Sequence, residues 1–173
     1  MEENVMYQIG DHLVHEGIGV CEVLDICEMA LNGKGSEKKY YVLVPYGDKG
    51  GRTFTPIDTQ KIRMRPVMTK EEITELVGMI PEVDCIHENN DKLRALKYRE
   101  ALSAFEADKL LKVIKTCYLG RRHRLRLGKK VLSGDERYSQ IAEKKLYDEI
   151  AFVFAMDTEK IKNWITNEIE KCS

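Results

Sequence analysis

Hydrophobic and polar positions alternate in short runs through the first third of the chain. The runs mix β-branched and aromatic residues with polar ones, as half-buried strands do, and cover residues 7–9, 12–15, 18–26, 39–44, 51–56 and 62–64. Turn signals such as Gly10-Asp11 and Glu16-Gly17 separate them. Strands this short, joined by tight turns, predict a small five-stranded barrel of the SH3 or Tudor type.

From residue 69 onward, apolar residues recur at helical spacing. Thr69-Lys-Glu-Glu72 has the form of a capping box, in which the Thr hydroxyl and the Glu carboxylate each accept a backbone N–H. The helix that follows buries Ile73, Leu76, Val77 and Ile80 and ends at Pro81. A polar linker, residues 82–90, is expected after it.

Four further helices are predicted beyond this linker. The first covers Lys92 to Ala104 and has Leu93 and Leu96 available for burial. The next two are expected to open with capping boxes at Ser103–Glu106 and Ser133–Glu136, and Asp157 is expected to cap the last. Short connections favour an antiparallel bundle.

The pattern therefore predicts an α+β chain, with a small Tudor-like or SH3-like barrel followed by an all-α bundle. Its expected parts are a barrel domain at residues 1–68, a helix and linker at 69–90, and a helical domain at 91–173. With 173 residues, 43% of them hydrophobic, the chain is long enough to bury a core without disulfides.

Cysteine and hydropathy patterns argue for a cytoplasmic protein. The five cysteines are scattered, with neither a CxxC pair nor zinc-like spacing to histidine, so we expect neither a disulfide framework nor a metal site. No apolar run approaches the roughly 20 residues that a membrane-spanning helix needs. The acidic start of the chain is unlike a secretory signal.

Catalytic motifs are not apparent in the sequence. The glycine-containing segments lack the spacing of a phosphate loop, and neither a GxSxG, an HExxH nor an EF-hand pattern occurs. We therefore expect a binding protein that has no cofactor and is not an enzyme.

Charge is distributed very unevenly along the chain. The net charge is −1, yet residues 1–82 hold 9 Lys/Arg and 14 Asp/Glu, whereas residues 92–130 hold 13 Lys/Arg and three Asp/Glu. The acids that could neutralise this basic segment lie later, in residues 135–170. A positive surface at one end of the bundle follows, and DNA, RNA and an acidic protein surface are all possible partners.

Two groups of cations define that surface. Arg94 and Lys97, three residues apart, are expected to project together opposite the Leu93–Leu96 stripe. The second group is expected to form an arginine-dense turn or short helix between Gly120 and Gly128, and comprises Arg121, Arg122, Arg124, Arg126, Lys129 and Lys130. Such clusters attract phosphate through charge and released counterions, and Arg adds bidentate geometry.

The barrel is expected to offer a different kind of site. A small open barrel has an exposed strand edge that can extend a sheet in another protein. Gly51–Pro56 is the candidate edge, because proline is tolerated there and Arg52 and Phe54 would flank the partner.

Several segments, taken in order, resemble the CarD/CdnL family of bacterial transcription regulators. The opening Tyr7–Val20, with its Gly-Asp and Gly-x-Gly turns, is similar to the start of that family. The similarity extends over about residues 5–156 and is carried further by Lys39–Leu43, Phe54–Pro56, Ile62-Arg63, Leu132–Glu136 and Ala142–Ala151.

The resemblance implies a Tudor-like domain that binds the β subunit of RNA polymerase, as does the matching module of the transcription-repair coupling factor, and a helical domain on promoter DNA. The polymerase contact would fall on Arg52, Thr53, Phe54, Thr55 and Pro56, with Met29 on the neighbouring strand. The DNA contact would be backbone or minor-groove in character, not sequence-specific, and would stabilise the opened promoter. We expect a monomer.

The implied DNA-binding residues combine both basic groups with the start of the first bundle helix. Many family members place a Trp wedge there, and this sequence has Lys92 or Leu93 instead. The full set is Lys92, Leu93, Arg94, Lys97, Arg99, Arg121, Arg122, Arg124, Arg126, Lys129 and Lys130. The alternative interpretation is a protein-only adaptor that uses the barrel edge for one partner and the basic helices for an acidic surface on another.

Overall fold

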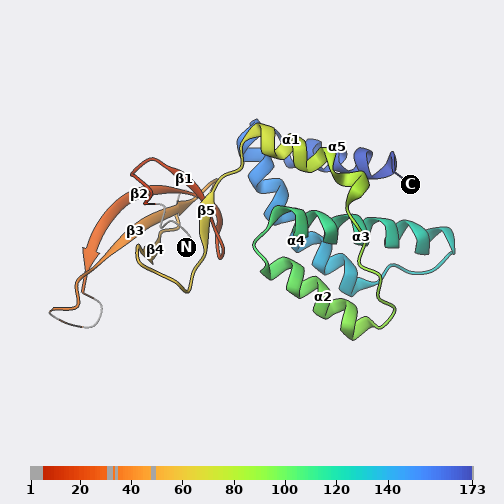
Figure 1. Ribbon diagram of the computed structural model, residues 1–173, viewed down its shortest axis with the longest axis horizontal. Coiled ribbons are helices and arrows are strands. Elements are labelled where there is room, and N and C mark those ends of the chain that lie inside the picture. Colours follow the sequence, from red (N-terminus) through yellow and green to blue (C-terminus); the bar gives the residue numbers. More distant parts are fainter. Residues whose placement is uncertain (1–5, 31–32, 34, 48–49, 173) are drawn as a thin grey trace. The chain divides into compact units, whose positions relative to one another are not determined.

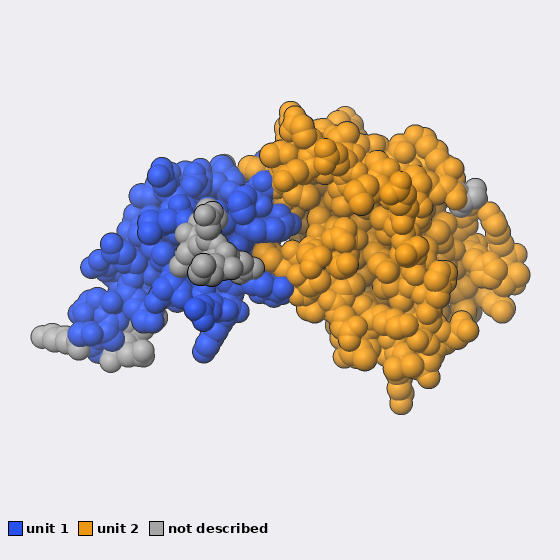
Figure 2. Space-filling model, in the orientation of Figure 1, with its two compact units in different colours: residues 1–67 blue, residues 68–173 orange. Residues whose placement is uncertain are grey.

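The computed structural model describes residues 6–30, 33, 35–47 and 50–172 of the chain (Figure 1). It consists of two compact units, residues 1–67 and residues 68–173 (Figure 2). The first is built on a sheet and the second on helices, which confirms the α+β class. Residues 1–5 and 173, at the outer ends of the predicted domains, lie outside the described residues.

The N-terminal unit is a five-stranded antiparallel sheet. Its strands are β1 (His12–His15), β2 (Gly19–Met29), β3 (Lys38–Pro45), β4 (Thr53–Pro56) and β5 (Met64–Pro66), in the spatial order β4-β3-β2-β1-β5. β4 and β5 are thus the two edges, and within the described residues no strand pairing joins them. The predicted closed barrel is not confirmed.

Alternation along the strands produces the core of this unit. Leu13, Cys21, Val23, Tyr41 and Leu43 lie on the same side of the sheet and are almost fully buried. Tyr7 joins them, and its N–H donates to the Tyr41 hydroxyl at 3.0 Å.

The predicted strand at residues 7–9 is wrong. Tyr7 is buried, but the residues after it turn: the Asp11 N–H donates to the Gln8 carbonyl, and the Asp11 carboxylate accepts the Gln8 N–H. An aspartate that closes such a turn outweighs the strand propensity of its neighbours.

The C-terminal unit contains five α-helices and one 3₁₀ turn. They are α1 (Lys70–Gly78), η1 (Ile80–Glu82), α2 (Asp91–Ser103), α3 (Ala107–Arg126), α4 (Ser133–Phe154) and α5 (Thr158–Glu170). Among the described residues, no helix is both long enough and apolar enough to cross a membrane.

The N-termini of the helices show which of the predicted capping residues form caps. The capping box at Thr69 is present in full, and Asp157 accepts the Glu159 N–H, so both predictions are confirmed. The boxes predicted at Ser103 and Ser133 are wrong, because Ser103 is the last residue of α2 and Ser133 the first of α4. α2 is capped by Asn90, which accepts two backbone N–H groups.

The segment expected to be a helix and a linker contributes to the helical core. Ile73, Val77 and Ile80 pack in the same buried cluster as residues of α3, α4 and α5. The buried Lys115 ammonium of α3 fixes the end of this segment by donating to the carbonyls of Ile80 (2.7 Å), Pro81 (3.3 Å) and Val83 (2.8 Å). This segment is therefore hydrogen-bonded to α3, although its sequence is polar.

Candidate interaction surfaces: a strand edge and a basic helix end

Among the described residues, the strand β4 pairs on one side only, with β3. Its register with β3 places Thr55 opposite Tyr41 and Thr53 opposite Leu43, and the Ile57 N–H donates to the Lys39 carbonyl at 3.0 Å. Hydrogen-bonded and non-bonded pairs alternate in an antiparallel ladder. The backbone groups of Thr53 and Thr55 therefore face β3, and those of Arg52, Phe54 and Pro56 face the open edge.

The side chains of β4, and of Arg52 just before it, alternate between the two faces of the sheet. Thr55 is fully buried, whereas Phe54 is 48% exposed and Arg52 is exposed. Pro56 has no N–H to donate, so it sits at an edge position without breaking the ladder. The predicted edge position of this strand is confirmed, and the edge combines free backbone groups with an exposed aromatic ring.

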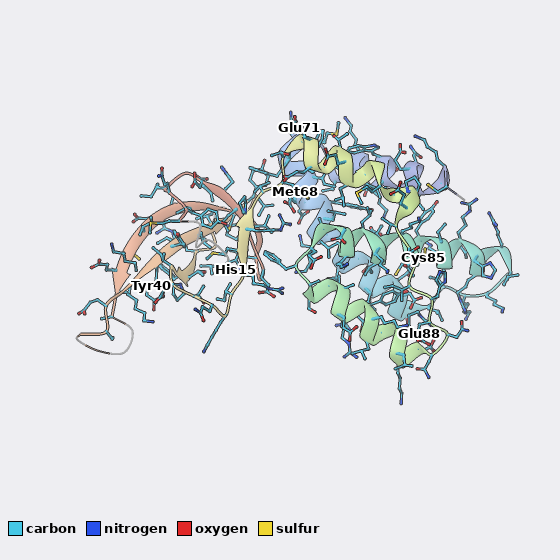
Figure 3. All side chains as sticks on the ribbon, viewed as in Figure 1. His15, Tyr40, Met68, Glu71, Cys85 and Glu88 are labelled. Atoms are coloured by element: carbon cyan, nitrogen blue, oxygen red, sulfur yellow. The ribbon has the colours of Figure 1, made fainter. Side chains whose placement is uncertain are left out.

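A buried histidine supports β4 from across the unit. His15 of β1, labelled in Figure 3, lies with Nε2 3.2 Å from the Thr55 hydroxyl, and its Nδ1 accepts the Gly17 N–H at 3.0 Å. Since Nδ1 is an acceptor, the ring is neutral with its proton on Nε2, which donates to Thr55. Burial lowers the pKa of His15, against a smaller opposing effect from Glu16. This contact, which sequence reasoning missed, links strands that are not neighbours in the sheet and requires the sheet to curve.

Met29 does not lie where the resemblance implied. It is the last residue of β2, opposite Lys38, and β3 separates β2 from β4. Directly opposed residues share a face of the sheet. The registers Cys27–Tyr40–Pro56 and Met29–Lys38 therefore put Met29 on the same face as Phe54 and Pro56, with β3 between them.

In the helical unit, Arg94 is not the exposed cation that the sequence predicts. Its guanidinium donates to the Asp135 carboxylate (3.1 Å), the Asp91 carboxylate (2.9 Å) and the Glu88 carbonyl (3.2 Å), and its side chain is 13% exposed. Burial opposes the charge, but the hydrogen bonds from the two aspartates raise the Arg94 pKa overall. Arg94 therefore joins α2 to α4 and is unavailable to phosphate.

The face of α2 that packs against the rest of the helical unit is therefore not the one predicted. Tyr98 is the buried residue of this helix, and its ring lies 5.3 Å from that of Tyr138. Leu93 and Leu96, predicted for burial, are 50% and 44% exposed. Lys97 pairs with Glu88 at 3.1 Å, which leaves Lys92 and Arg99 with no side-chain partner among the described residues.

The second basic group forms the end of a long helix. α3 continues through Gly120 to Arg126, so the predicted separate turn or short helix is wrong. Cations at a helix C-terminus interact favourably with its dipole. Arg121 pairs with Glu136 of α4 at 3.4 Å, and the Arg124 guanidinium donates to the Lys130 carbonyl at 2.7 Å.

Ion pairs bring the two basic groups to the same end of the helical unit. Asp135 and Glu136, adjacent in the first turn of α4, hold Arg94 from the start of α2 and Arg121 from the end of α3. The sequence analysis noted acids in residues 135–170 but did not pair these two with the basic segment, because the pairing depends on how α4 packs against α2 and α3. The side chains of Lys92, Arg99, Arg126, Lys129 and Lys130 make no hydrogen bond or ion pair within the described part of the chain.

A cavity of about 570 Å³ lies behind this end, between α3, α4, α5 and the segment around Cys85. Three ion pairs line it, Arg94–Asp135, Arg121–Glu136 and Lys162–Glu143. Cys117 lies deeper, and burial raises its pKa to about 12, so its thiol is protonated and unreactive at neutral pH. Within the described residues, no group of three His, Cys, Asp or Glu side chains is placed to hold a metal ion.

Comparison with known families gives one match, to the N-terminal unit. No curated protein matches this chain. Residues 7–68, which span β1 to β5 and include the β4 edge, match the family model of the CarD-like/TRCF RID domain, an RNA polymerase-interacting domain. Residues 7–68 of this chain are therefore similar to the CarD-like/TRCF RID domain.

Proposed function

We propose that this protein regulates transcription by binding the β subunit of RNA polymerase through the β4 edge and promoter DNA through the basic end of its helical unit. The observation that carries the proposal is the RID family match over residues 7–68. Binding that favours the opened promoter over the closed one shifts that equilibrium by its differential affinity, tenfold for about 1.4 kcal/mol.

Strand addition is the mode that β4 supports best. The outward N–H and C=O groups of Phe54 and the outward groups of Arg52 provide main-chain hydrogen bonds to an incoming strand. The exposed Phe54 ring offers apolar area to the partner, and Pro56 limits how far the added strand can extend.

The DNA contact is supported by the cations that have no carboxylate partner among the described residues. Lys92 and Arg99 of α2, with Arg126, Lys129 and Lys130 beyond α3, project from a unit whose other basic residues are partly neutralised. Side chains of this kind bind the phosphate backbone without reading base sequence. Arg94 is not part of this contact, because its guanidinium is held by Asp135 and Asp91.

Two substitutions of Phe54 test the polymerase contact. Phe54→Pro removes the outward N–H and the ring, but it removes no hydrogen bond to β3; Phe54→Ala removes only the ring. In a pull-down of the host's core polymerase by the full chain, we expect Phe54→Ala to weaken capture and Phe54→Pro to abolish it. If the proline variant is folded and captures polymerase as well as the wild type does, strand addition at β4 is wrong.

The DNA contact is tested separately by salt dependence. The Arg126→Ser/Lys129→Ser/Lys130→Ser variant should bind duplex DNA with a log-log salt slope smaller by about 3, roughly one per lost phosphate contact, and should capture polymerase normally. The control is Lys144→Ser/Lys160→Ser, which removes exposed cations from other parts of α4 and α5. An unchanged slope in the triple variant would remove DNA from the proposal.

A second function has one observation in its favour. Arg94, Lys97 and Arg121 are each held by a carboxylate, so the cationic surface is smaller than the sequence suggests. A protein-only adaptor, with the remaining cations on an acidic protein surface, is supported if the wild-type chain captures polymerase but is not retained by DNA at low salt.

A further inference from the structure

The end of α3 and the turn after it, residues 121–130, are closed by several hydrogen bonds, and we name this segment the α3 tip. Gly128 has a left-handed backbone (φ +66°), the Gly128 N–H donates to the Leu125 carbonyl (3.0 Å), and the Lys129 N–H donates to the Arg124 carbonyl (2.9 Å). This pair of bonds is the Schellman pattern of helix termination. The Arg124 guanidinium, bound to the Lys130 carbonyl, closes the turn from the other side.

Two leucines stand out on the α3 tip. Leu125 and Leu127 are each 55% exposed, the most exposed leucines in the described residues. A Schellman turn ordinarily covers itself with an apolar contact between the third-last helical residue and the residue after the glycine. Here those positions are Arg124 and Lys129, so the usual apolar pair is replaced by two cations, and the leucines lie elsewhere on the turn.

The charged residues around these leucines in the sequence, Lys and Arg, are all positive. Residues 121–130 contain six Lys/Arg and no Asp or Glu. The side chains of Arg126, Lys129 and Lys130 have no partner within the described residues. The complementary surface is thus a polyanion that also offers apolar area within reach of its charges.

DNA with unpaired bases fits this description better than an intact duplex or an anionic membrane. In a duplex the bases are stacked and the phosphates alone would meet the tip, whereas an opened stretch exposes base faces beside the phosphates, and apolar side chains can insert at such steps. A membrane-surface helix needs a broad apolar face, and the last turns of α3 carry Arg121, Arg122, Arg124 and Arg126 around the helix.

We propose that the α3 tip is selective for opened DNA: Leu125 and Leu127 bind unpaired bases, while Arg126, Lys129 and Lys130 bind the adjacent phosphates. This inference rests on the proposed function, because it requires that the helical unit binds DNA. It adds to that function a preference for opened DNA located on the α3–α4 turn, apart from α2.

Fluorescence anisotropy with the full chain tests the inference. The probes are a duplex and the same duplex with a central unpaired stretch, at one salt concentration. We expect the wild type to prefer the opened probe, and Leu125→Ala/Leu127→Ala to lose about tenfold of that preference, the size expected from covering two half-exposed leucines. Duplex affinity should be unchanged, since alanine retains the helix and every cation.

Matched variants separate the possible results. Met79→Ala removes a comparably exposed apolar side chain from the end of α1 and should leave the preference intact. Arg126→Ser/Lys129→Ser/Lys130→Ser should weaken binding to both probes.

Equal wild-type affinity for the two probes, or an unchanged preference in the leucine variant, would overturn the inference and leave the proposed function standing. If the leucine substitutions instead abolish binding to phosphatidylglycerol vesicles and spare the DNA preference, a membrane is the partner and the inference is wrong. No binding to either probe at low salt would overturn both the inference and the DNA part of the proposed function.

Discussion

The two units treat their polar groups in opposite ways. In the sheet unit, β4 has backbone donors and acceptors at an edge that no other strand of the described residues pairs with, and the buried His15 supports it by a contact with Thr55. In the helical unit, cations that are isolated in the sequence find acceptors in three dimensions: Arg94 meets Asp135, and Lys115 meets three carbonyls. An interaction edge can thus be inferred from topology, whereas an interaction patch requires each charge to be traced to its partner.

The largest effect should come from the most deeply buried of these internal contacts. Lys115→Ala removes the hydrogen bonds that the ammonium donates to the carbonyls of Ile80 and Val83, together with the packing of a long side chain. We expect the helical unit to lose about 3 kcal/mol of unfolding free energy, measured by urea denaturation. Lys160→Ala, an exposed lysine of α5, is the control and should change stability by less than about 0.5 kcal/mol. Equal losses in the two variants would contradict the comparison.

Arg94 and Arg99 provide the sharpest matched pair, five residues apart on α2. Arg94→Met breaks contacts to Asp135 and Asp91 and should cost about 2 kcal/mol, discounted because the Asp91 partner is exposed to solvent. Arg99→Met should leave stability unchanged and reduce the salt slope of DNA binding by about 1. The reverse result, with Arg94 affecting the salt slope and Arg99 the stability, would contradict the assignment of Arg99 to the cationic face and of Arg94 to the interior contacts.

Acid should weaken the sheet unit through His15. The folded pKa of this histidine lies below its unfolded value of about 6.5, so the unfolded state binds more protons once the pH falls below that value. Stability is therefore fully present above about pH 6.5 and declines on acidification, by at most about 1.4 kcal/mol per pH unit for one proton. Thermal unfolding of the wild type and of His15→Gln at pH 5.5 and 7.5 measures this loss of stability. An equal pH response in the two proteins would show that His15 is not its source.

The smallest effect concerns helix starts. Thr69→Ala removes a hydroxyl that accepts the Glu72 N–H at 3.1 Å and should cost about 1 kcal/mol. Ser133→Ala, at a position that looks equivalent in the sequence, should cost only a few tenths, because Ser133 forms no cap. Urea midpoints of the two variants compare them directly, and similar losses would mean that Ser133 caps α4 after all.

Features that depend on residues close together in the chain could be predicted from the sequence, whereas features that depend on tertiary packing could not. The β4 edge, the Thr69 capping box and the α+β class all follow from residues close together in the chain. The position of Arg94 could not be predicted in this way, because its partner Asp135 lies 41 residues away and depends on how α2 and α4 pack. The same reason explains why Leu93 and Leu96 are exposed: the burial of Tyr98 fixes which face of α2 turns inward.

The surface carrying the candidate polymerase site was only partly predictable. Phe54, Arg52 and Pro56 lie at the edge as their sequence indicates. Met29 was expected on the strand next to this edge, but it ends β2, and the order β4-β3-β2 puts β3 between them. His15 carries no sequence signal for its role, since its contact with Thr55 spans 40 residues and arises only when the sheet curves.

Amide hydrogen exchange at single-residue resolution, with and without the host's core polymerase, tests the central claim most directly. The Phe54 and Arg52 amides face the open edge, and those of Thr53 and Thr55 face β3. Strand addition predicts that polymerase slows exchange at Phe54 and Arg52 and leaves Thr53 and Thr55 as they were. Polymerase binding with unchanged exchange at Phe54 would contradict it.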